Sequence, residues 1–119
     1  MKCTIGIPAF NEEKNIAGII VKLKKIADTI IVCNDGSNDA TSEIASNLGA
    51  IVIDHPKNLG YGASINTIFS KSKELGSEIL VTFDADGQHR IEDISFVTEP
   101  IIKNKAELVI GSRFLNLKS

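Results

Sequence analysis

The stretch that decides the fold is Ile79-Leu80-Val81-Thr82-Phe83-Asp84-Ala85-Asp86-Gly87-Gln88-His89, in which a short apolar run ends abruptly in polar side chains. Such a run, bounded by turn residues, is typical of a strand buried on both faces of a sheet. In an extended chain, side chains two residues apart leave the same face, about 6.6 Å apart along the strand. Asp84 and Asp86 are therefore expected to point into one site just past the carboxyl end of this strand.

Two carboxylates placed so close repel each other unless a positive charge lies between or beside them. Mg²⁺ suits this position, because it takes one or two protein carboxylates and leaves coordination positions for phosphate oxygens. The alternative is a structural turn, since Asp, Gly and Gln are common after strands and Asp caps helices. Asp84 and Asp86 alone do not distinguish a cation site from a structural turn. The rest of the sequence has to distinguish them.

Composition bounds the class of protein. The 119 residues, of which 43% are hydrophobic, are enough for one domain with a core, over residues 1–119. The formal net charge of −2, with both signs interspersed, argues against a nucleic-acid-binding surface. The sequence shows no apolar run of about 18 residues and no signal-peptide pattern, so we expect a soluble cytoplasmic domain. Cys3 and Cys33 are expected to be reduced residues of the core.

Apolar runs and helical periodicity alternate along the chain. The first helix has an apolar face made of Ile16, Ile19, Ile20, Leu23 and Ile26. A fourth helix is expected around residues 94–101. This alternation predicts an α/β fold with a Rossmann-like, mostly parallel sheet and helices on both faces. The expected strands are Cys3–Ile7, stopped by Pro8, then Thr29–Cys33, Ala50–Ile53, Ile79–Phe83 and Leu108–Ile110.

Polar clusters follow the carboxyl end of every expected strand. Ligands of open α/β sheets bind in the crevice at this edge, so the clusters are expected to line one crevice. The clusters are residues 8–12, 34–39, 58–62, 84–89 and 111–113.

Several of these clusters also have a purely structural interpretation. Gly60-Tyr61-Gly62 lacks the third glycine of a dinucleotide fingerprint and follows the third strand, so it fits a tight turn equally well. The run 34–39 is either a capped turn or a ligand site in which Asp35 accepts hydrogen bonds from a base or a ribose. The planar guanidinium of Arg113 suits phosphate, but it can also be a solvated surface group. His55 and His89 lack the spacing of a metal pair.

Five stretches in register resemble the family 2 glycosyltransferases, nucleotide-sugar enzymes of the GT-A fold. The Asp-Ala-Asp-Gly-Gln-His form with a closing Gly-Ser-Arg is most similar to the polyprenyl- or dolichyl-phosphate mannosyl- and glucosyltransferases. The stretches are residues 7–13, 34–41, 58–63, 83–89 and 111–114, and together they cover essentially the whole chain.

The resemblance implies a set of site residues. It places Pro8, Phe10 and Glu12 beside the nucleotide and Asp35 against the base. Asp86 and Gln88 would hold Mg²⁺ or Mn²⁺, with Asp84 as a further candidate ligand. The nucleotide-sugar-binding residues that it implies are Pro8, Phe10, Glu12, Asp35, Asp84, Ala85, Asp86 and Arg113.

The reaction that the resemblance implies is an inverting displacement at the anomeric carbon of a UDP- or GDP-linked hexose. A lipid phosphate or a saccharide would be the acceptor, and the cation would neutralise the departing diphosphate. The carboxylates present suit the metal and the nucleotide, so the general base is not identifiable. A peripheral position at the cytoplasmic face of a membrane is the alternative to a free cytoplasmic one.

Two departures from the family pattern matter. Asn34 stands where the family usually has an acid. The sequence ends at Ser119, shortly after the last expected strand, so the acceptor-binding half of the family is missing. We therefore expect this chain to be at best a poor transferase, with self-association through an uncovered apolar face.

Two other functions compete with transfer. The first is a nucleotide-sugar-binding module without transfer activity. The second is a phosphohydrolase of the haloacid-dehalogenase type, in which Asp84 would attack phosphorus. That family places its loop after the first strand and usually continues it with Thr, whereas here the loop follows the fourth strand and continues with Gln88-His89.

Overall fold

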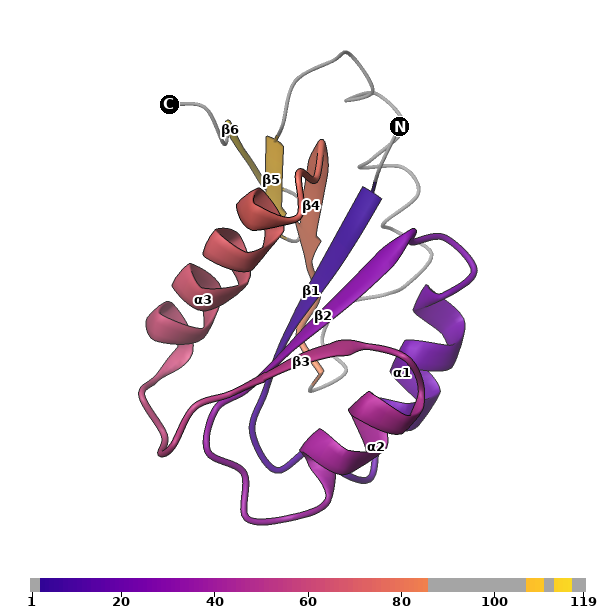
Figure 1. The fold of residues 1–119 in the computed structure, drawn as a ribbon, viewed down its shortest axis with the longest axis vertical. Coiled ribbons are helices and arrows are strands. Elements are labelled where there is room, and N and C mark those ends of the chain that lie inside the picture. The colour runs from indigo at the N-terminus through magenta and orange to yellow at the C-terminus, as the bar shows by residue number, and fades with distance from the viewer. Residues whose placement is uncertain (1–2, 86–106, 111–112, 117–119) are drawn as a thin grey trace.

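The computed structural model describes residues 3–85, 107–110 and 113–116, which form one sheet flanked by helices (Figure 1). Within these residues the strands are β1 (Cys3–Ala9), β2 (Thr29–Asn34), β3 (Ile51–Asp54), β4 (Ile79–Thr82), β5 (Glu107–Ile110) and β6 (Arg113–Asn116). The helices are α1 (Ile16–Leu23), α2 (Thr41–Asn47) and α3 (Tyr61–Glu74).

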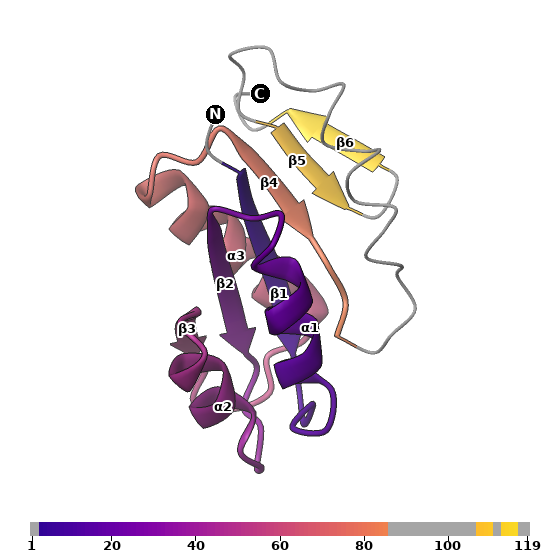
Figure 2. The same cartoon turned by 90° about the vertical axis from the view of Figure 1, so that its right-hand side faces the viewer.

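The sheet is mostly parallel, as the sequence predicts. Its order is β3-β2-β1-β4-β5-β6, and only β6 runs antiparallel to its neighbour. α1 and α2 cover one face while α3 covers the other (Figure 2). The strand order reverses between β1 and β4, which makes the carboxyl ends of these two strands the topological switch point of the sheet.

Burial on both faces explains the continuous apolar runs of the central strands. In β2, Ile30 and Val32 pack into the cluster that contains Ile16 and Ile20 of α1. The intervening residues of β2 belong to the cluster that contains Ile68 of α3. Since successive side chains of a strand leave opposite faces, a strand covered by helices on both sides needs apolar residues at every position.

β1 continues through Pro8, where the sequence suggested a stop. The carbonyl of Gly6 accepts a hydrogen bond from the Phe83 N–H at 2.9 Å, on the β4 side of the strand. Pro8 faces the same side as Gly6, because strand residues alternate in direction. The β1–β4 ladder has already ended at the Gly6–Thr82 pair. The missing N–H of Pro8 therefore removes no sheet hydrogen bond, and pairing with β2 extends to Ala9.

Other details differ from the predictions. Ile26 lies beyond the end of α1 and is exposed, so it is not part of the buried face of that helix. The short antiparallel β6 was not predicted. The expected helix around residues 94–101 lies outside the described residues. Cys33 is buried, whereas Cys3 is half-buried, and neither forms a disulfide with the other. Among the described residues, no helix is long and apolar enough to cross a membrane.

Candidate functional site

The loops that follow β1 and β2 are tied together at the carboxyl edge of the sheet, where the parallel strands end. Asn11 adopts a left-handed backbone (φ 54°) that Asn tolerates better than most residues. Its N–H donates to the Ser37 hydroxyl at 2.8 Å, and its side-chain oxygen accepts from the Asn38 N–H at 2.9 Å. These reciprocal bonds hold the two loops in register.

A second set of bonds joins the same loops at the start of α2. The Glu12 N–H donates to the Thr41 hydroxyl at 2.9 Å, and the Ala40 N–H donates to the Glu13 carboxylate at 3.0 Å. Asp39 accepts from both the N–H and the hydroxyl of Thr41. Desolvation would raise the pKa of the Asp39 carboxyl, but these hydrogen bonds outweigh it and lower that pKa. Much of the 34–41 motif thus serves to fix the loops.

The loops after β2 and β3 touch through their backbones. Gly36 has φ 76°, a conformation that favours glycine. A Cβ atom at this position would lie 2.5 Å from the carbonyl carbon of Lys57 and 2.6 Å from the amide nitrogen of Asn58. No side chain at position 36 fits between the two loops, so glycine at this position allows their backbones to pack against each other.

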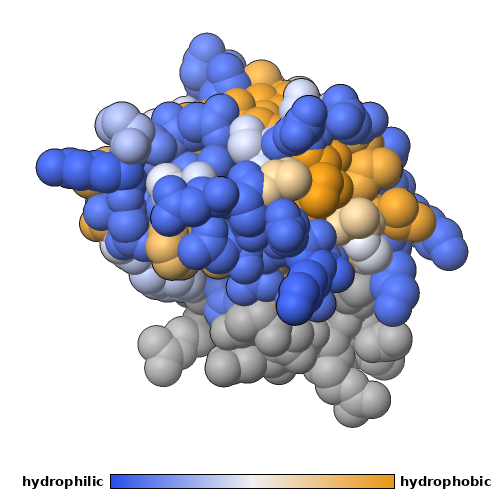
Figure 3. Space-filling model, turned by 90° about the horizontal axis from the view of Figure 1, so that it is seen from below, coloured by the Kyte–Doolittle hydropathy of each residue, from blue (hydrophilic) through white to orange (hydrophobic). Residues whose placement is uncertain are grey.

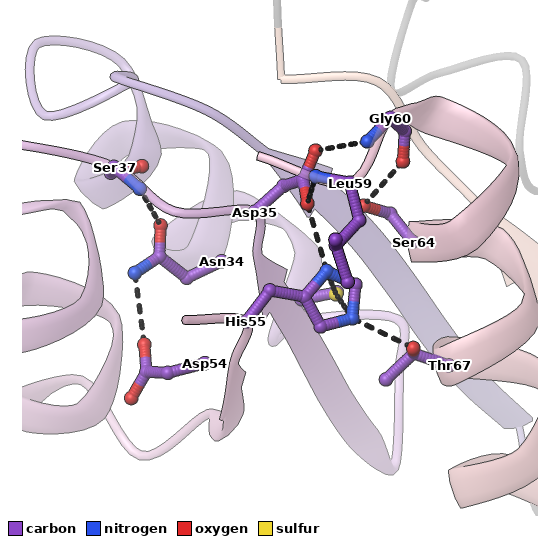
Figure 4. A network of polar contacts seen from close by, with 10 residues as sticks. Asn34, Asp35, Ser37, Asp54, His55, Leu59, Gly60, Ser64 and Thr67 are labelled. Carbon is purple, nitrogen blue, oxygen red and sulfur yellow. Dashed lines mark hydrogen bonds and ion pairs between the residues drawn. The ribbon is translucent and has the colours of Figure 1, made fainter. Parts of the chain in front are cut away.

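Asp35 is the centre of this junction (Figure 4). Its Oδ1 accepts from the Leu59 N–H and from Nδ1 of His55, both at 2.8 Å, and its Oδ2 accepts from the Gly60 N–H at 2.9 Å. Burial by itself would raise the pKa of the Asp35 carboxyl, but the hydrogen bonds from these three donors outweigh burial and hold the pKa below its usual value. Asp35 is therefore an ionised carboxylate that joins the loops after β2 and β3.

Asn34 makes the departure from the family pattern intelligible. Its amide NH₂ donates to Oδ1 of Asp54 at 2.9 Å, and its side-chain oxygen accepts from the Ser37 N–H at 3.2 Å (Figure 4). Asn34 and Asp54 are paired residues of β2 and β3. An acid at position 34 would face the Asp54 carboxylate, and it would have no donor to offer it. The amide satisfies both neighbours.

Two adjoining hollows open on the carboxyl edge. The Asp35 pocket, of about 190 Å³, is lined by Pro8, Ala9, Phe10, Asp35, Asn58, Gly60, Tyr61 and Ser64. The Asp84 pocket, of about 180 Å³, is lined by Pro8, Phe10, Glu12, Tyr61, Asp84 and Ala85. The two share Pro8, Phe10 and Tyr61 as common walls. Because residues after β1 and β4 line the second hollow, it lies at the topological switch point, the usual ligand crevice of open α/β sheets.

The structure brings together every predicted site residue whose side chain it describes. These are the six residues Pro8, Phe10, Glu12, Asp35, Asp84 and Ala85, and each of them lines one or both pockets. Asp86 and Gln88 lie outside the described residues. The backbone of Arg113 begins β6, opposite Ile110, and its side chain is outside the description.

Tyr61 belongs to the 58–62 cluster that the sequence placed at the crevice, but the sequence analysis gave it no role of its own. It lies at the first position of α3 and lines both hollows. Asn58 and Ser64 line the Asp35 pocket as well. Their place after the third strand identified residues 58–62 as part of the crevice, whereas Ser64, on the first turn of α3, carried no signal of its own.

Carboxylate oxygens are present where a divalent cation was predicted. Glu12 and Asp84 both line the Asp84 pocket. Oxygen ligands of this kind suit Mg²⁺ and Mn²⁺. No group of three or more His, Cys, Asp or Glu side chains suited to a metal occurs among the described residues. The described carboxylates thus supply two of the oxygen donors that a divalent cation would need, and the predicted ligands Asp86 and Gln88 lie outside the described residues.

Exposed apolar side chains surround the pockets. Phe10 is 43% exposed, Leu59 47% and Tyr61 53%, and all three belong to the loops or the helix start at this edge. Figure 3 looks onto this edge and shows hydrophobic areas set among hydrophilic side chains. Large flat apolar groups beside carboxylates suit a ligand with a planar ring and polar substituents.

Comparison with known proteins gives a family match. The model of the family described as Glycosyl transferase family 2 matches residues 4–118. A UDP-N-acetylglucosamine–dolichyl-phosphate N-acetylglucosaminyltransferase of Methanococcus voltae is 41% identical, with 94% of this chain and 52% of that protein covered. A polyprenol monophosphomannose synthase of Mycolicibacterium smegmatis is 31% identical, with coverages of 92% and 44%. The chain spans about half the length of the curated relatives it matches.

Solved structures share the fold. A glucosyl-3-phosphoglycerate synthase of Mycobacterium tuberculosis, crystallised with Mn²⁺, UDP and glucosyl-3-phosphoglycerate, superposes with a TM-score of 0.69 at 23% sequence identity. The superposition covers 87% of this chain and 40% of that one. At this level of identity, the likeness shows a common fold.

Proposed function

The chain is a member of glycosyl transferase family 2, and on that premise we propose that its carboxyl edge binds the nucleoside diphosphate of a nucleotide-sugar donor. The observation that carries the proposal is the meeting of six predicted residues around two joined hollows at the switch point of the sheet. The hollows contain both elements that such a ligand needs. Flat apolar walls can hold a base, and acidic side chains can hold ribose hydroxyls and a cation that neutralises the diphosphate.

The base is proposed to lie in the Asp35 pocket. An ionised carboxylate only accepts hydrogen bonds, so Asp35 favours a base edge that carries an N–H group. Uracil and guanine carry a ring N–H on that edge, whereas the ring nitrogen of cytosine is an acceptor and its only donor there is the exocyclic amino group. Phe10 and Tyr61, both partly exposed on the pocket walls, offer ring faces for stacking. UDP and GDP are therefore the two nucleotides to test first.

The diphosphate is proposed to lie toward the Asp84 pocket, with Mg²⁺ or Mn²⁺. Asp84, Asp86 and Gln88 are the candidate ligands, and Glu12 brings a further carboxylate to the same hollow. The chemistry that a bound cation supplies is neutralisation of the charge on a departing diphosphate. Without one, the acidic side chains of the hollow would repel the phosphates. Arg113 is proposed to meet the diphosphate or the sugar.

The acceptor is proposed to be a polyprenyl or dolichyl phosphate, and the transfer to be an inverting displacement. This proposal rests on the relatives, whose names specify dolichyl phosphate and polyprenol as acceptors. A phosphate acceptor is ionised at neutral pH and needs little help from a general base. A peripheral position at the cytoplasmic face of a membrane, where such a lipid would be met, belongs to the same proposal.

Calorimetric titration of the chain with UDP, GDP and CDP, each with Mn²⁺ and with a chelator, tests donor binding. We expect UDP or GDP to bind more tightly than CDP and to lose at least about tenfold in affinity, or about 1.4 kcal/mol, without metal. Asp86→Ala should behave like the chelated protein. Lys73→Ala is the matched control, since Lys73 lies on α3 outside both pockets. Equal binding of all three nucleotides would contradict the assignment of the base.

Transfer is tested separately from binding. Donor, Mn²⁺ and a short polyprenyl phosphate are supplied, and glycolipid formation is measured. The 119 residues span about half the length of their curated relatives, and positioning of an acceptor can lower the barrier of such reactions by roughly 7–11 kcal/mol. We therefore expect slow turnover from these residues alone. Binding without any product would support a nucleotide-sugar-binding module. Turnover on the order of 1 s⁻¹ or faster, an ordinary enzymatic rate, would show that the acceptor site is complete.

A further inference from the structure

His55 is a neighbour of the Asp35 pocket that contacts the Asp35 carboxylate from outside the pocket lining. It follows β3, it lines neither pocket, and its side chain is 9% exposed against 7% for that of Asp35. Nδ1 of His55 is 2.8 Å from Oδ1 of Asp35, and Nε2 is 2.8 Å from the hydroxyl oxygen of Thr67 on α3 (Figure 4). Both ring nitrogens therefore have polar partners, which fixes the plane of the imidazole.

The carboxylate of Asp35 has few acceptor positions left. Each carboxylate oxygen offers about two lone-pair sites. Oδ1 uses both, for His55 and for the Leu59 N–H, while Oδ2 uses one for the Gly60 N–H. Among the contacts of the described residues, one site on Oδ2 remains for a ligand. Because three donors hold the carboxylate, that site has a fixed direction.

Asp35 is an acceptor, so the hydrogen of the shared bond must lie on Nδ1 of His55. Nε2 then either accepts a hydrogen bond from the Thr67 hydroxyl or donates one to it, since a hydroxyl can do both. Thr67 thus keeps the ring in place in either protonation state. The other titratable groups near the ring are few. Sγ of Cys33 is 3.5 Å from Nε2, and burial raises the pKa of this thiol. The carboxylate of Asp54, next in the chain, is engaged with Asn34.

We propose that His55, held by Thr67, is a positioning residue that aims the remaining acceptor site of Asp35 at the base and so sets the base preference of the Asp35 pocket. This inference rests on the proposed function. It differs from a structural role in one respect. A structural residue affects the binding of all nucleotides alike, whereas a positioning residue affects most those whose base offers a ring N–H to Asp35 and affects least a base such as cytosine, whose ring nitrogen is an acceptor.

The test uses matched substitutions at the two positions. His55→Leu fills the space and removes both ring nitrogens, while His55→Asn places an amide N–H close to the position of Nδ1. Thr67→Val removes the hydroxyl with little change of shape, and Thr67→Ser keeps it. Circular dichroism and thermal unfolding show whether each variant folds. Dissociation constants for the preferred one of UDP and GDP, and for CDP, are then measured.

We expect His55→Leu to weaken the preferred nucleotide about tenfold, as for one charge-assisted hydrogen bond, and to change CDP less than about threefold. His55→Asn should restore most of the preference, and Thr67→Val should lie between His55→Leu and the unchanged chain. In an Asp35→Asn background, His55→Leu should add little, because both changes act on one contact. A base preference unchanged by His55→Leu, or an equal loss for all nucleotides, would overturn the proposal.

If His55→Leu does not fold, Thr67→Val and His55→Asn carry the same comparison. A second measurement needs no ligand. Long-range ¹H–¹⁵N spectra report which ring nitrogen of His55 carries hydrogen, and we expect a protonated Nδ1 at neutral pH. An unprotonated Nδ1 would overturn the contact with Asp35. Failure of the unchanged chain to bind any nucleoside diphosphate would instead overturn the proposed function, even with Nδ1 protonated.

Discussion

At the scale of single residues, the pairing of Asn34 with Asp54 makes a sharp prediction. Asn34→Asp would set two carboxylates against each other at positions that now share a 2.9 Å hydrogen bond. We expect a loss of about 1 kcal/mol in the free energy of unfolding, the net worth of one part-buried hydrogen bond, since Asp54 itself is exposed. Denaturant unfolding measures it. Adding Asp54→Asn should recover much of the loss, and strictly additive effects of the two substitutions would refute the interpretation.

Asp35 makes a prediction about acid. Its pKa is lowered in the folded protein, so its contribution to stability is complete above the unfolded pKa of about 3.9. That contribution is lost as the pH falls through the lower folded pKa. Urea midpoints between about pH 2.5 and 6 should therefore fall toward acid, less steeply in Asp35→Asn. Asp39, whose pKa is also lowered, leaves part of the slope in place. Identical slopes in both proteins would contradict the role of Asp35.

The role of Asp35 shows how far single residues could be predicted. Asp35 lines a pocket at the carboxyl edge, where the sequence predicted a crevice, and its contact with a base stays a prediction. Its second role, as the link between two loops, was beyond prediction. Two of its three donors are backbone N–H groups of Leu59 and Gly60, 24 and 25 residues away. Every residue except proline has a backbone N–H, so no sequence motif predicts that these two groups bind Asp35.

At the scale of elements, Gly36 and Gly18 differ in whether there is space for a side chain, so their substitution by alanine should change stability in opposite directions. Gly36→Ala would force a Cβ against the backbone of the loop after β3, at a φ of 76°. We expect a loss of about 2–4 kcal/mol in stability and weaker nucleotide binding. Gly18→Ala is the matched control, because in α1 a Cβ meets nothing within 4 Å. That change should stabilise by about 0.5–1 kcal/mol. Thermal and denaturant unfolding decide, and a neutral Gly36→Ala would contradict the loop contact.

The apolar runs of the sequence predicted which segments form strands, but they did not predict the residues at which the strands end. β1 passed Pro8 because pairing on its two sides stops at different residues, and this asymmetry is a property of the sheet. β6 is four residues long and lies at the sheet edge. A segment this short carries almost no periodic signal. The local pattern therefore identified central strands well and edge features poorly.

At the scale of the whole molecule, the proposed binding of a nucleotide predicts a change in the stability of the fold. A nucleotide that binds only the folded chain, at about 100 times its dissociation constant, adds about 2.7 kcal/mol to stability. For a domain of this size we expect the melting temperature to rise by roughly 8–15 °C. Thermal unfolding with UDP or GDP and Mn²⁺ measures the shift, and CDP serves as the control. Equal shifts with CDP would argue against a base-selective site.

The reversal of strand order has a consequence for synthesis on the ribosome. β1 can pair with β2 as soon as residue 34 has emerged, but its other edge waits for β4, because Cys3 pairs with Ile79. At about 5–20 residues per second, that central edge stays open for several seconds. Unpaired strand edges are templates for unwanted pairing with other chains. The crevice cannot exist before the same moment, since Asp84 and Ala85 form one of its walls. The pocket at the carboxyl edge is thus completed in the same step that pairs the open edge of β1.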